Sequence, residues 1–552
     1  MASQETAPLG LKKDAVNFIS SVVIGVASTA PGYSLAATLG FIVAAVGLQS
    51  PAILWLAFVP MLLVATAYLF MNKADPDCGT SFAWVGKAMG PWTGWLTGWA
   101  IIVADIVVMA NLAQIAGLYS VLLYNDIVPT DIETTTTLVT SIGVVWIAVM
   151  AFICWKGTEL SATTQRYLLS AEVLTLSAFA VVALYKVYAG DALDTSIKPE
   201  LSWFSPFAID STDGLVAGVL LAIFIYWGWD SAVTVNEETT DDRTSNAPGK
   251  SAIWSTIILV LIYVIVGTAA VAFAGTEQLA DAEEVFDLLG TQVFGTPWNI
   301  ILVIAVLTSA AASTQTTILP TARTSLSMAR VKAAPSMFGT IHPRNLTPST
   351  STIWMGVLSI LWYVGLTIVS ENILFDSLAA LGLMIAFYYG LSGFACCIYY
   401  RRAIMNTSTG ATAAGIALAV GVVVLVVATL LESWFLAYFA FAFFVIALVL
   451  GLLNARSIKA FLLIGVAPAA GAVTLTYVFF KSCSDLSDPV NSESGDSWLG
   501  VGPPLVIGAS FLLLGVILML IWASGHPTFF RSKPTTFDGD LSGTAASPPT
   551  VV

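Results

Sequence analysis

Long runs of apolar residues recur along the chain from Ala15 to Ala523, separated by short polar segments. Each run is about twenty residues or longer, which is the length that a helix needs to cross the hydrocarbon core of a membrane. The pattern predicts an all-α polytopic membrane protein with about fourteen transmembrane helices. The expected spans are 15–47, 51–71, 93–124, 137–155, 167–189, 214–237, 251–274, 298–319, 353–370, 374–400, 411–431, 434–453, 460–480 and 502–523.

The first and sixth runs are each interrupted by a short polar break that contains glycine. Pro31 and Gly32 lie near the middle of the first run, and Gly228 and Asp230 lie in the sixth. An unpaired backbone amide in lipid costs several kcal/mol, so such a break persists only where it lines a protected cavity. Paired breaks in the two halves of a chain are typical of the binding site of a secondary transporter.

The order of the helices predicts an internal symmetry. Spans 1–5 and spans 6–10 contain equal numbers of helices, and a broken helix opens each set. Because five is odd, the second set enters the membrane in the opposite orientation, which predicts an inverted five-helix repeat. Gly32 and Gly228 are 196 residues apart, and this separation is the expected repeat offset.

The same pattern divides the chain into five parts. We expect a cytoplasmic N-terminal tail at 1–13, a ten-helix transport core at 14–402, an additional helix pair at 403–455 and the last two transmembrane helices at 456–524. The remainder, 525–552, is polar and rich in Pro, Ser and Thr, which predicts a flexible cytoplasmic tail.

Composition and charge narrow the class of protein. Apolar residues make up 57% of the chain and charged residues 10%, against roughly 45–50% and 25% in soluble domains. This excludes a soluble enzyme held by a membrane anchor. With the N-terminus inside, only Lys186, Lys198 and Lys481 of the 21 basic residues fall in outer loops. Basic residues favour the cytoplasmic side, so we expect a plasma-membrane protein with both termini in the cytoplasm.

Other functional classes lack the residues that they need. The basic residues are scattered one or two to a loop, which argues against nucleic-acid binding. Two histidines and no C-x-x-C pair give no support to a metal site, and we expect no cofactor. There is no nucleophile–base set for an enzyme and no soluble output domain for a sensor. No span carries the regular polar stripe of a channel. The expected partners are a small-molecule substrate and membrane lipid.

Four segments carry a resemblance to a known family. They are VASTAPGYS at the first break, DPDCGTSFAWVGKAMGPWTGWLTGW in the next inner loop, FIYWGWDSAVTVNEET at the second break and ARTSLSMARVKAAPSMFGTIHPRNLTP after the eighth span. Over roughly 14–402 the chain resembles the amino acid–polyamine–organocation permeases. The resemblance implies a transporter core with discontinuous helices 1 and 6 and a substrate bound between them.

The chain departs from the pattern of that family in three places. Residues 28–32, STAPG, stand where the family usually has a glycine-serine-glycine break, so the resemblance does not identify the substrate. Val331 and Lys332 stand where an Asp-Gly pair is frequent. The segment 403–455 adds two helices to the commoner twelve, and its almost uniformly apolar residues predict an interaction or lipid-facing role.

The first break predicts a site for a substrate carboxylate. Pro31 has no N–H group and disfavours helix at Ala30, so we expect the helix to restart near Gly32. Free amides at that helix N-terminus carry a partial positive charge and would hold an anion. A simple proline kink is the alternative. The neighbouring residues that complete this predicted subsite are Ser28, Thr29, Tyr33 and Ser34.

The second break predicts a site for a substrate ammonium group. Gly228 is expected to unwind the chain so that carbonyl groups from Phe224 to Trp227 face the cavity. The resemblance implies that Phe224 stands at an aromatic lid. Tyr226, Trp227 and Trp229 are expected to stack on a cation or wall the pocket, with ordinary packing as the alternative.

Three of the carboxyl groups within spans are candidate site residues, because an ionised carboxylate there costs about 2.5–3.5 kcal/mol and therefore usually faces a cavity or a partner. Asp230 is expected to bind a substrate amine or, alternatively, to cap the half-helix that follows. The resemblance places Glu172 where many sodium-independent relatives carry a lysine. A buried glutamate there would load and release a proton, so Glu172 is the expected coupling residue, with a structural pair as the alternative. Asp105, with Asn111 and Gln114 on the same span, is a weaker candidate, and hydrogen bonding between helices is the favoured explanation.

Sodium coupling stays open as an alternative to proton coupling. A sodium site needs hydroxyl and carbonyl oxygens from spans 1 and 8. Span 8 carries the hydroxyl residues Ser309, Ser313, Thr314, Thr316 and Thr317. Such residues also serve helix packing, so they permit sodium without requiring it.

The leading hypothesis is a secondary active transporter that imports an amino acid with protons, by alternating access around a site at the membrane midplane. A permease for a polyamine or another organic amine is the alternative, with Asp230 as its central residue. These patterns leave open the substrate, the coupling stoichiometry and the oligomeric state. They also leave open whether the protein takes up its substrate or exchanges it.

Overall fold

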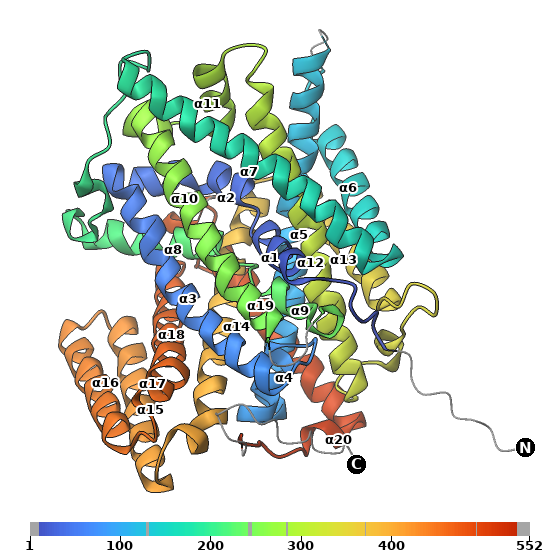
Figure 1. Cartoon of the computed structure of the whole chain (residues 1–552), viewed down its shortest axis with the longest axis vertical. Coiled ribbons are helices and arrows are strands. Elements are labelled where there is room, and N and C mark those ends of the chain that lie inside the picture. Colours follow the sequence, from blue (N-terminus) through green and yellow to red (C-terminus); the bar gives the residue numbers. More distant parts are fainter. Residues whose placement is uncertain are drawn as a thin grey trace, which may run out of the picture.

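The computed structural model describes residues 10–128, 132–240, 245–282, 285–369, 371–492 and 494–537. Within these ranges the chain is helical, apart from turns, loops and three isolated bridges between single residues. Figure 1 shows the helices gathered into one bundle, with a separate pair at its edge.

The helices follow the chain in two sets and a C-terminal group. The first set contains α1 (Phe18–Ser28), α2 (Pro31–Val46), α3 (Ser50–Ala74), α4 (Ser81–Met89), α5 (Pro91–Ile127), α6 (Thr136–Lys156) and α7 (Thr158–Ala189). The second set contains α8 (Thr212–Ile225), α9 (Ser231–Thr234), α10 (Ala247–Ala280), α11 (Val285–Phe294), α12 (Ile300–Arg330), α13 (Ser349–Val369) and α14 (Glu371–Ile404). The last group contains α15 (Ser408–Leu430), α16 (Trp434–Asn454), α17 (Ile458–Ala460), α18 (Ala467–Asp485), α19 (Pro503–Gly525) and α20 (Pro527–Phe530).

Short helices of other types join these elements. A π-helical stretch, η6 (Phe461–Val466), runs between α17 and α18. The 3-10 helices are η1 (Gly47–Gln49), η2 (Leu201–Phe204), η3 (Pro206–Ala208), η4 (Asn236–Glu238), η5 (Ser336–Gly339) and η7 (Pro489–Asn491).

The number of membrane crossings agrees with the apolar pattern. Twelve helical stretches among the described residues are long and apolar enough to cross a membrane. One of them, Phe18–Ala74, contains both the broken helix α1–α2 and helix α3. The apolar helix Gly214–Ile225 within α8 is shorter than this measure requires. The twelve long stretches, one of which holds two predicted spans, agree with the expectation of about fourteen, and the span at α8–α9 stays a prediction.

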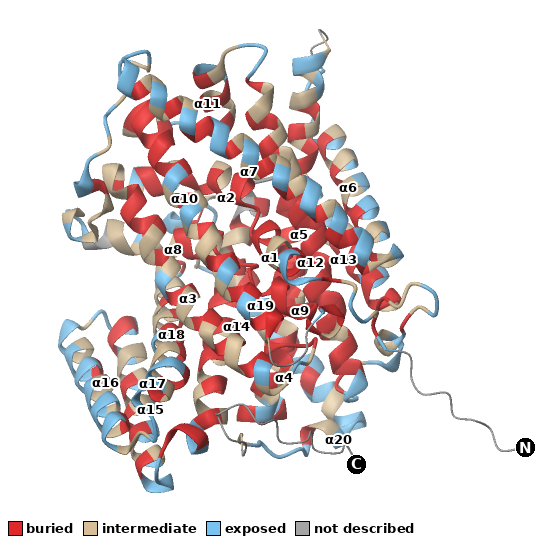
Figure 2. Cartoon of the chain, in the orientation of Figure 1, coloured by how far each residue is buried: buried red, intermediate tan, exposed pale blue. Residues whose placement is uncertain are grey.

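Packing between the two sets reflects the predicted repeat. Three pairs of helices at corresponding places in the two sets pack against one another, α3 with α10, α5 with α12 and α6 with α13. The halves of the two broken helices pack crosswise, α2 with α8 and α1 with α9. A broken helix opens each set, as expected. The all-α architecture with discontinuous helices 1 and 6 is confirmed. Among the twelve stretches, α5 and α12 are the most deeply buried, and Figure 2 shows them at the centre of the bundle.

The pair α15–α16 lies at the edge of the bundle, at the lower left of Figure 1. Its helices contact each other extensively and otherwise pack chiefly against α18. Phe435, Tyr438 and Phe439 on α16 are exposed. An apolar outer face of this kind suits lipid. The assignment of 403–455 as a separate domain stays a prediction.

Both chain ends are more closely packed than their composition predicted. Leu11 is buried beside Cys78, and Lys12 pairs with Glu159 at 2.7 Å. After α19, Phe537 lies over Tyr400, with ring centroids 4.8 Å apart. Leu11, Lys12 and Phe537 thus contact the rest of the chain, and the two tails stay predictions. The rest of both predicted tails, 1–9 and 538–552, lies outside the described residues.

Candidate functional site

The first break forms where the proline predicted it. Helix α1 ends at Ser28, Ala30 adopts a left-handed conformation with φ 48°, and Pro31 is the first residue of α2. Proline is well suited to this first helical position because it has no N–H group to leave unpaired. The N-terminus of α2 is thus turned into the protein interior.

The amides at this N-terminus are not free, and that expectation is wrong. The Gly32 amide donates to Glu172 Oε1 at 2.7 Å, and the Tyr33 amide donates to Ser309 Oγ at 3.1 Å. The Ser34 amide donates to the Ala30 carbonyl at 2.7 Å. Glu172 comes from α7 and Ser309 from α12. Because a buried amide without an acceptor is costly, distant side chains supply what the broken helix lacks.

Glu172 of α7 is fully buried where that helix meets α2 and α12. Its Oε2 has no hydrogen-bond partner within the described part of the chain. A Cβ atom at Gly32 would lie 3.5 Å from Glu172 Oε1 and 3.3 Å from the Ala305 carbonyl, so glycine permits this close approach. The arrangement is a carboxyl group with one oxygen bound to a helix N-terminus and the other unpaired.

The second break lies directly against the first. Gly228 has φ 112°, and a Cβ there would lie 2.8 Å from the Ser28 carbonyl oxygen. Ser28 Oγ and Ser231 Oγ are 2.9 Å apart, and Ser313 Oγ donates to the Ser28 carbonyl at 2.9 Å. Glycine is needed here for both its conformation and its lack of a side chain.

Asp230 does not cap the short helix that follows it, so that alternative is wrong. Its carboxylate instead accepts hydrogen bonds from three tyrosines, Tyr389 at 2.8 Å and Tyr68 and Tyr388 at 3.4 Å each. The tyrosines belong to α3 and α14. They were not predicted as site residues, because nothing in the sequence indicates that these helices meet the second break. Tyr68 is also hydrogen bonded to Ser81 at the start of α4.

The aromatic residues of the second break divide into two roles. Trp229 stacks on Tyr389 with ring centroids 5.1 Å apart, and Tyr226 donates its hydroxyl to the Leu54 carbonyl at 2.8 Å. These two contacts are packing. Trp227 donates to the hydroxyl of Tyr388 at 2.5 Å, and its side chain also lines a cavity.

A small cavity of about 10 Å³ lies between the two breaks and helices α5 and α12. This volume is about that of one water-sized sphere. Its lining residues are Ser28, Thr29, Ala30, Tyr33, Ser34, Val108, Leu112, Phe224, Trp227 and Ser313. Of the residues predicted for the substrate site, Ser28, Thr29, Ala30, Tyr33, Ser34, Phe224 and Trp227 therefore meet at one cavity. Pro31, Gly32, Gly228, Trp229 and Asp230 do not line it.

Two lining residues were missed by the sequence patterns. Val108 and Leu112 come from α5, where they are two apolar residues among many. Asp105 lies one turn before Val108 but accepts a hydrogen bond from Thr321 of α12 at 2.5 Å. Asn111 donates to Ser377 at 3.1 Å. These bonds join helices, as the alternative for Asp105 anticipated.

A buried ion pair lies on the side of the bundle that is expected to face the cytoplasm. Arg323 of α12 and Glu238 of η4 are both almost fully buried, with Arg323 Nε 2.6 Å from Glu238 Oε2. Thr158 at the start of α7 donates to Glu238 Oε1 at 2.6 Å. The Val16 amide, ahead of α1, donates to the Glu238 carbonyl at 3.1 Å. Segments from four parts of the chain thus close this end of the site.

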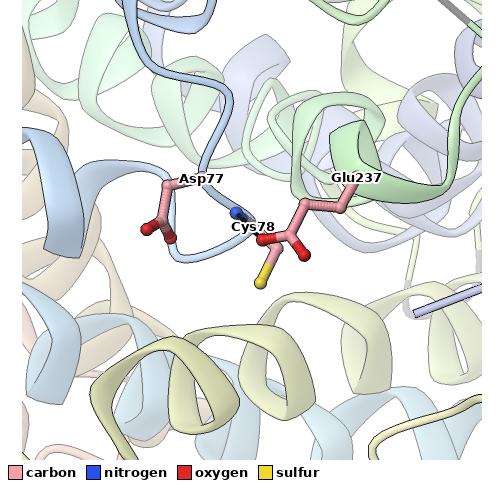
Figure 3. A group of neighbouring side chains, drawn as sticks. All are labelled: Asp77, Cys78 and Glu237. Carbon is pink, nitrogen blue, oxygen red and sulfur yellow. Dashed lines mark hydrogen bonds between the residues drawn. The ribbon is translucent and has the colours of Figure 1, made fainter. Parts of the chain in front are cut away.

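Three possible metal ligands lie beside that pair. Figure 3 shows Asp77 and Cys78 on one loop with Glu237 facing them, and their ligand atoms lie within 4.8 Å of one another. Arg330 fills this position, with Nη1 2.7 and 3.0 Å from the Glu237 oxygens and 3.6 Å from Cys78 Sγ. A guanidinium group therefore supplies the positive charge, and we assign the group to ion pairing.

The pKa values of Asp77 and Glu237 depend on burial and on nearby charges, including that of Arg330. Burial and the nearby charge of Asp75 raise the pKa of Asp77 above its ordinary value. Burial also acts to raise the pKa of Glu237, but the hydrogen bonds and charge of Arg330 outweigh it and leave that pKa lowered. Glu237 is thus held as an anion at neutral pH.

Comparison with known proteins agrees with this architecture. The family described as "Amino acid permease" matches residues 14–460. A cationic amino acid transporter of Arabidopsis thaliana, described as vacuolar, is 24% identical over 318 residues, which are 55% of this chain and 50% of that protein. An uncharacterized transporter of Mycobacterium tuberculosis is 25% identical over 51% of this chain and 58% of its own. A branched-chain amino acid permease of Lactococcus lactis is 23% identical over 36% and 43%. The chain thus spans about half the length of the relatives it matches.

Proposed function

The chain belongs to the amino acid permease family, and from that premise we propose that it is a secondary active transporter that imports an amino acid together with protons. It is an integral membrane protein, with twelve stretches long and apolar enough to cross a membrane among its described residues. The two breaks, in contact around a cavity, support alternating access around a central site. We propose that both termini lie in the cytoplasm, because basic residues favour cytoplasmic loops, and that the membrane is the plasma membrane.

The observation that carries proton coupling is the bond between Glu172 and the Gly32 amide. An ionised carboxylate holds such an amide strongly, because a charge-assisted hydrogen bond is roughly twice as strong as a neutral one. A proton on the unpaired Oε2 weakens that hold. The helix N-terminus then becomes available to a substrate carboxylate, so proton and substrate bind together.

Contacts at the expected cytoplasmic end support alternating access, because they close the site on that side. The Arg323–Glu238 pair and the Val16 contact hold α12, η4 and the segment before α1 together. Release of the substrate to that side requires these contacts to separate. The small cavity volume fits a site that widens when a substrate enters.

Two of the relatives are named as transporters of cationic and branched-chain amino acids, which supports an amino acid as the substrate class. An organic amine is the alternative. It would need Asp230, whose oxygens are already bonded to three tyrosines. Thermal stabilisation separates the two, since a ligand at a hundred times its Kd adds about 2.7 kcal/mol. We expect stabilisation by an amino acid and none by its decarboxylated amine; the reverse result assigns the protein to amines.

The coupling is tested with purified protein in liposomes. Wild type should accumulate an amino acid when a proton gradient is imposed and not when a sodium gradient replaces it. Glu172→Gln keeps an oxygen for the Gly32 amide but has no proton to release. We expect this variant to lose gradient-driven accumulation and to retain exchange of substrate across the membrane.

The matched control is Glu159→Gln, because Glu159 is an exposed carboxylate on the same helix, paired with Lys12. Its accumulation should equal that of wild type. Full accumulation by Glu172→Gln would remove Glu172 as the coupling residue. Accumulation driven by sodium alone would replace the proton as the coupling ion, and absence of any amino acid uptake by wild type would refute the transport function.

A further inference from the structure

The cavity between the two breaks is lined by two chemically different groups of residues. Hydroxyl groups come from Ser28 of α1, Thr29 between α1 and α2, Tyr33 and Ser34 of α2, and Ser313 of α12. The apolar lining comes from α5, the end of α8 and the two breaks. A substrate with a polar amino acid backbone and an apolar side chain matches this division.

The apolar lining is built from residues one helical turn apart. Val108 and Leu112 lie four residues apart on α5, so they share one face of that helix. Both are buried, with 3% and 1% of their surface exposed. Phe224 lies in the last turn of α8, and Trp227 lies two residues beyond the end of that helix, in the second break. Together these four side chains form the wall that a substrate side chain would contact.

No charged side chain lines this cavity in the described part of the chain. Of the three buried carboxyl groups nearby, Asp230 and Asp105 are hydrogen bonded elsewhere, and Glu172 carries a proton on its unpaired Oε2 when substrate binds in the proposed coupling. Asp230 accepts from Tyr389 at 2.8 Å, Glu172 from Gly32 at 2.7 Å and Asp105 from Thr321 at 2.5 Å. A lysine or arginine substrate would therefore bring a charge to mid-membrane without a counter-charge, which is strongly unfavourable.

We infer that the transported amino acid is neutral, with an aliphatic side chain held by Val108, Leu112 and Phe224. This inference rests on the proposed function and names the substrate of the same site. The aromatic face of Trp227 attracts a cation, but less strongly than burial of an unpaired charge opposes it. The wall of α5 thus selects against the cationic side chains that one relative's name specifies.

The first test is competition in liposomes that contain the wild-type protein. Uptake of labelled leucine under a proton gradient is measured with valine, isoleucine, lysine or arginine as competitor. We expect valine and isoleucine to compete at concentrations about a hundredfold lower than lysine and arginine, the ratio that an unpaired mid-membrane charge implies. Equal or stronger competition by lysine and arginine would overturn the inference and leave amino acid transport standing.

The second test supplies the missing counter-charge. Leu112→Asp places a carboxylate in the apolar wall, and Leu112→Asn is its uncharged match in size. We expect lysine uptake by the Asp variant alone and weakened leucine uptake by both. Lysine uptake by both variants or by neither, with both folded, would contradict the role of this wall. If the Asp variant does not fold, the wild-type competition decides. Uptake of no amino acid by wild type would instead refute the proposed function itself.

Discussion

The buried pair between Arg323 and Glu238 allows a quantitative test of what holds the expected cytoplasmic end closed. Arg323→Met removes the guanidinium group and keeps a long apolar side chain. Glu238 is fully buried and would keep the hydroxyl of Thr158, at 2.6 Å, as a side-chain partner. Loss of one partner of a buried pair costs about 3–5 kcal/mol, because the remaining charge stays buried and uncompensated. We expect the free energy of unfolding to fall by that amount.

The assay is a double-mutant cycle in detergent micelles, with unfolding followed by circular dichroism as denaturant is added. Glu238→Gln and the combined variant complete the cycle. The combined variant leaves no lone buried charge, so it should lose less stability than the two single variants added together. Arg330→Met is the matched control on the same helix. Its pair with Glu237 is partly exposed, at 35% and 25%, so about 0–1 kcal/mol is expected.

Two results would refute this reasoning. The first is a cycle that adds within about 0.5 kcal/mol, which would mean that Arg323 and Glu238 are not coupled. The second is an Arg323→Met variant that is no less stable than Arg330→Met, which would mean that burial does not decide the cost.

Two further predictions concern the second break and its neighbouring ion pair. Gly228→Ala should lower Tm, because positive φ and a Cβ 2.8 Å from the Ser28 carbonyl each cost about 1–3 kcal/mol. Gly382→Ala, inside α14 with nothing within 4 Å, is the control that should not lower Tm, because alanine favours helix over glycine. Glu237 has a lowered pKa, so its stabilising effect is present above the ordinary glutamate pKa of about 4.3 and is lost as the pH falls through the folded value. The Tm difference between wild type and Glu237→Gln should therefore be larger at pH 7 than at pH 4, and an equal difference at both would contradict the assignment.

Features that depend on local chemistry could be predicted from the sequence alone. A run of apolar residues forms a spanning helix because its backbone must pair internally in lipid, whatever its neighbours are. The break at Pro31 is equally local, since proline lacks an N–H group and restricts Ala30. The crossings, the two breaks and their symmetric placement followed from such rules.

Partners across the bundle depended on the tertiary structure. Whether the Gly32 amide is free depends on Glu172, 140 residues further along the chain. The direction of the Asp230 side chain depends on tyrosines from α3 and α14, and no local pattern decides it. Val108 and Leu112 differ from other apolar residues of α5 only in facing the breaks.

The sequence by itself thus determined the helices, the positions of the two breaks and seven residues that meet at the cavity. The tertiary structure alone decided which polar groups are already paired and which remain for a substrate or a proton. The physical reason is that backbone hydrogen bonding and hydrophobic length act within a helix, whereas buried charges and amides at a break must find partners on other helices.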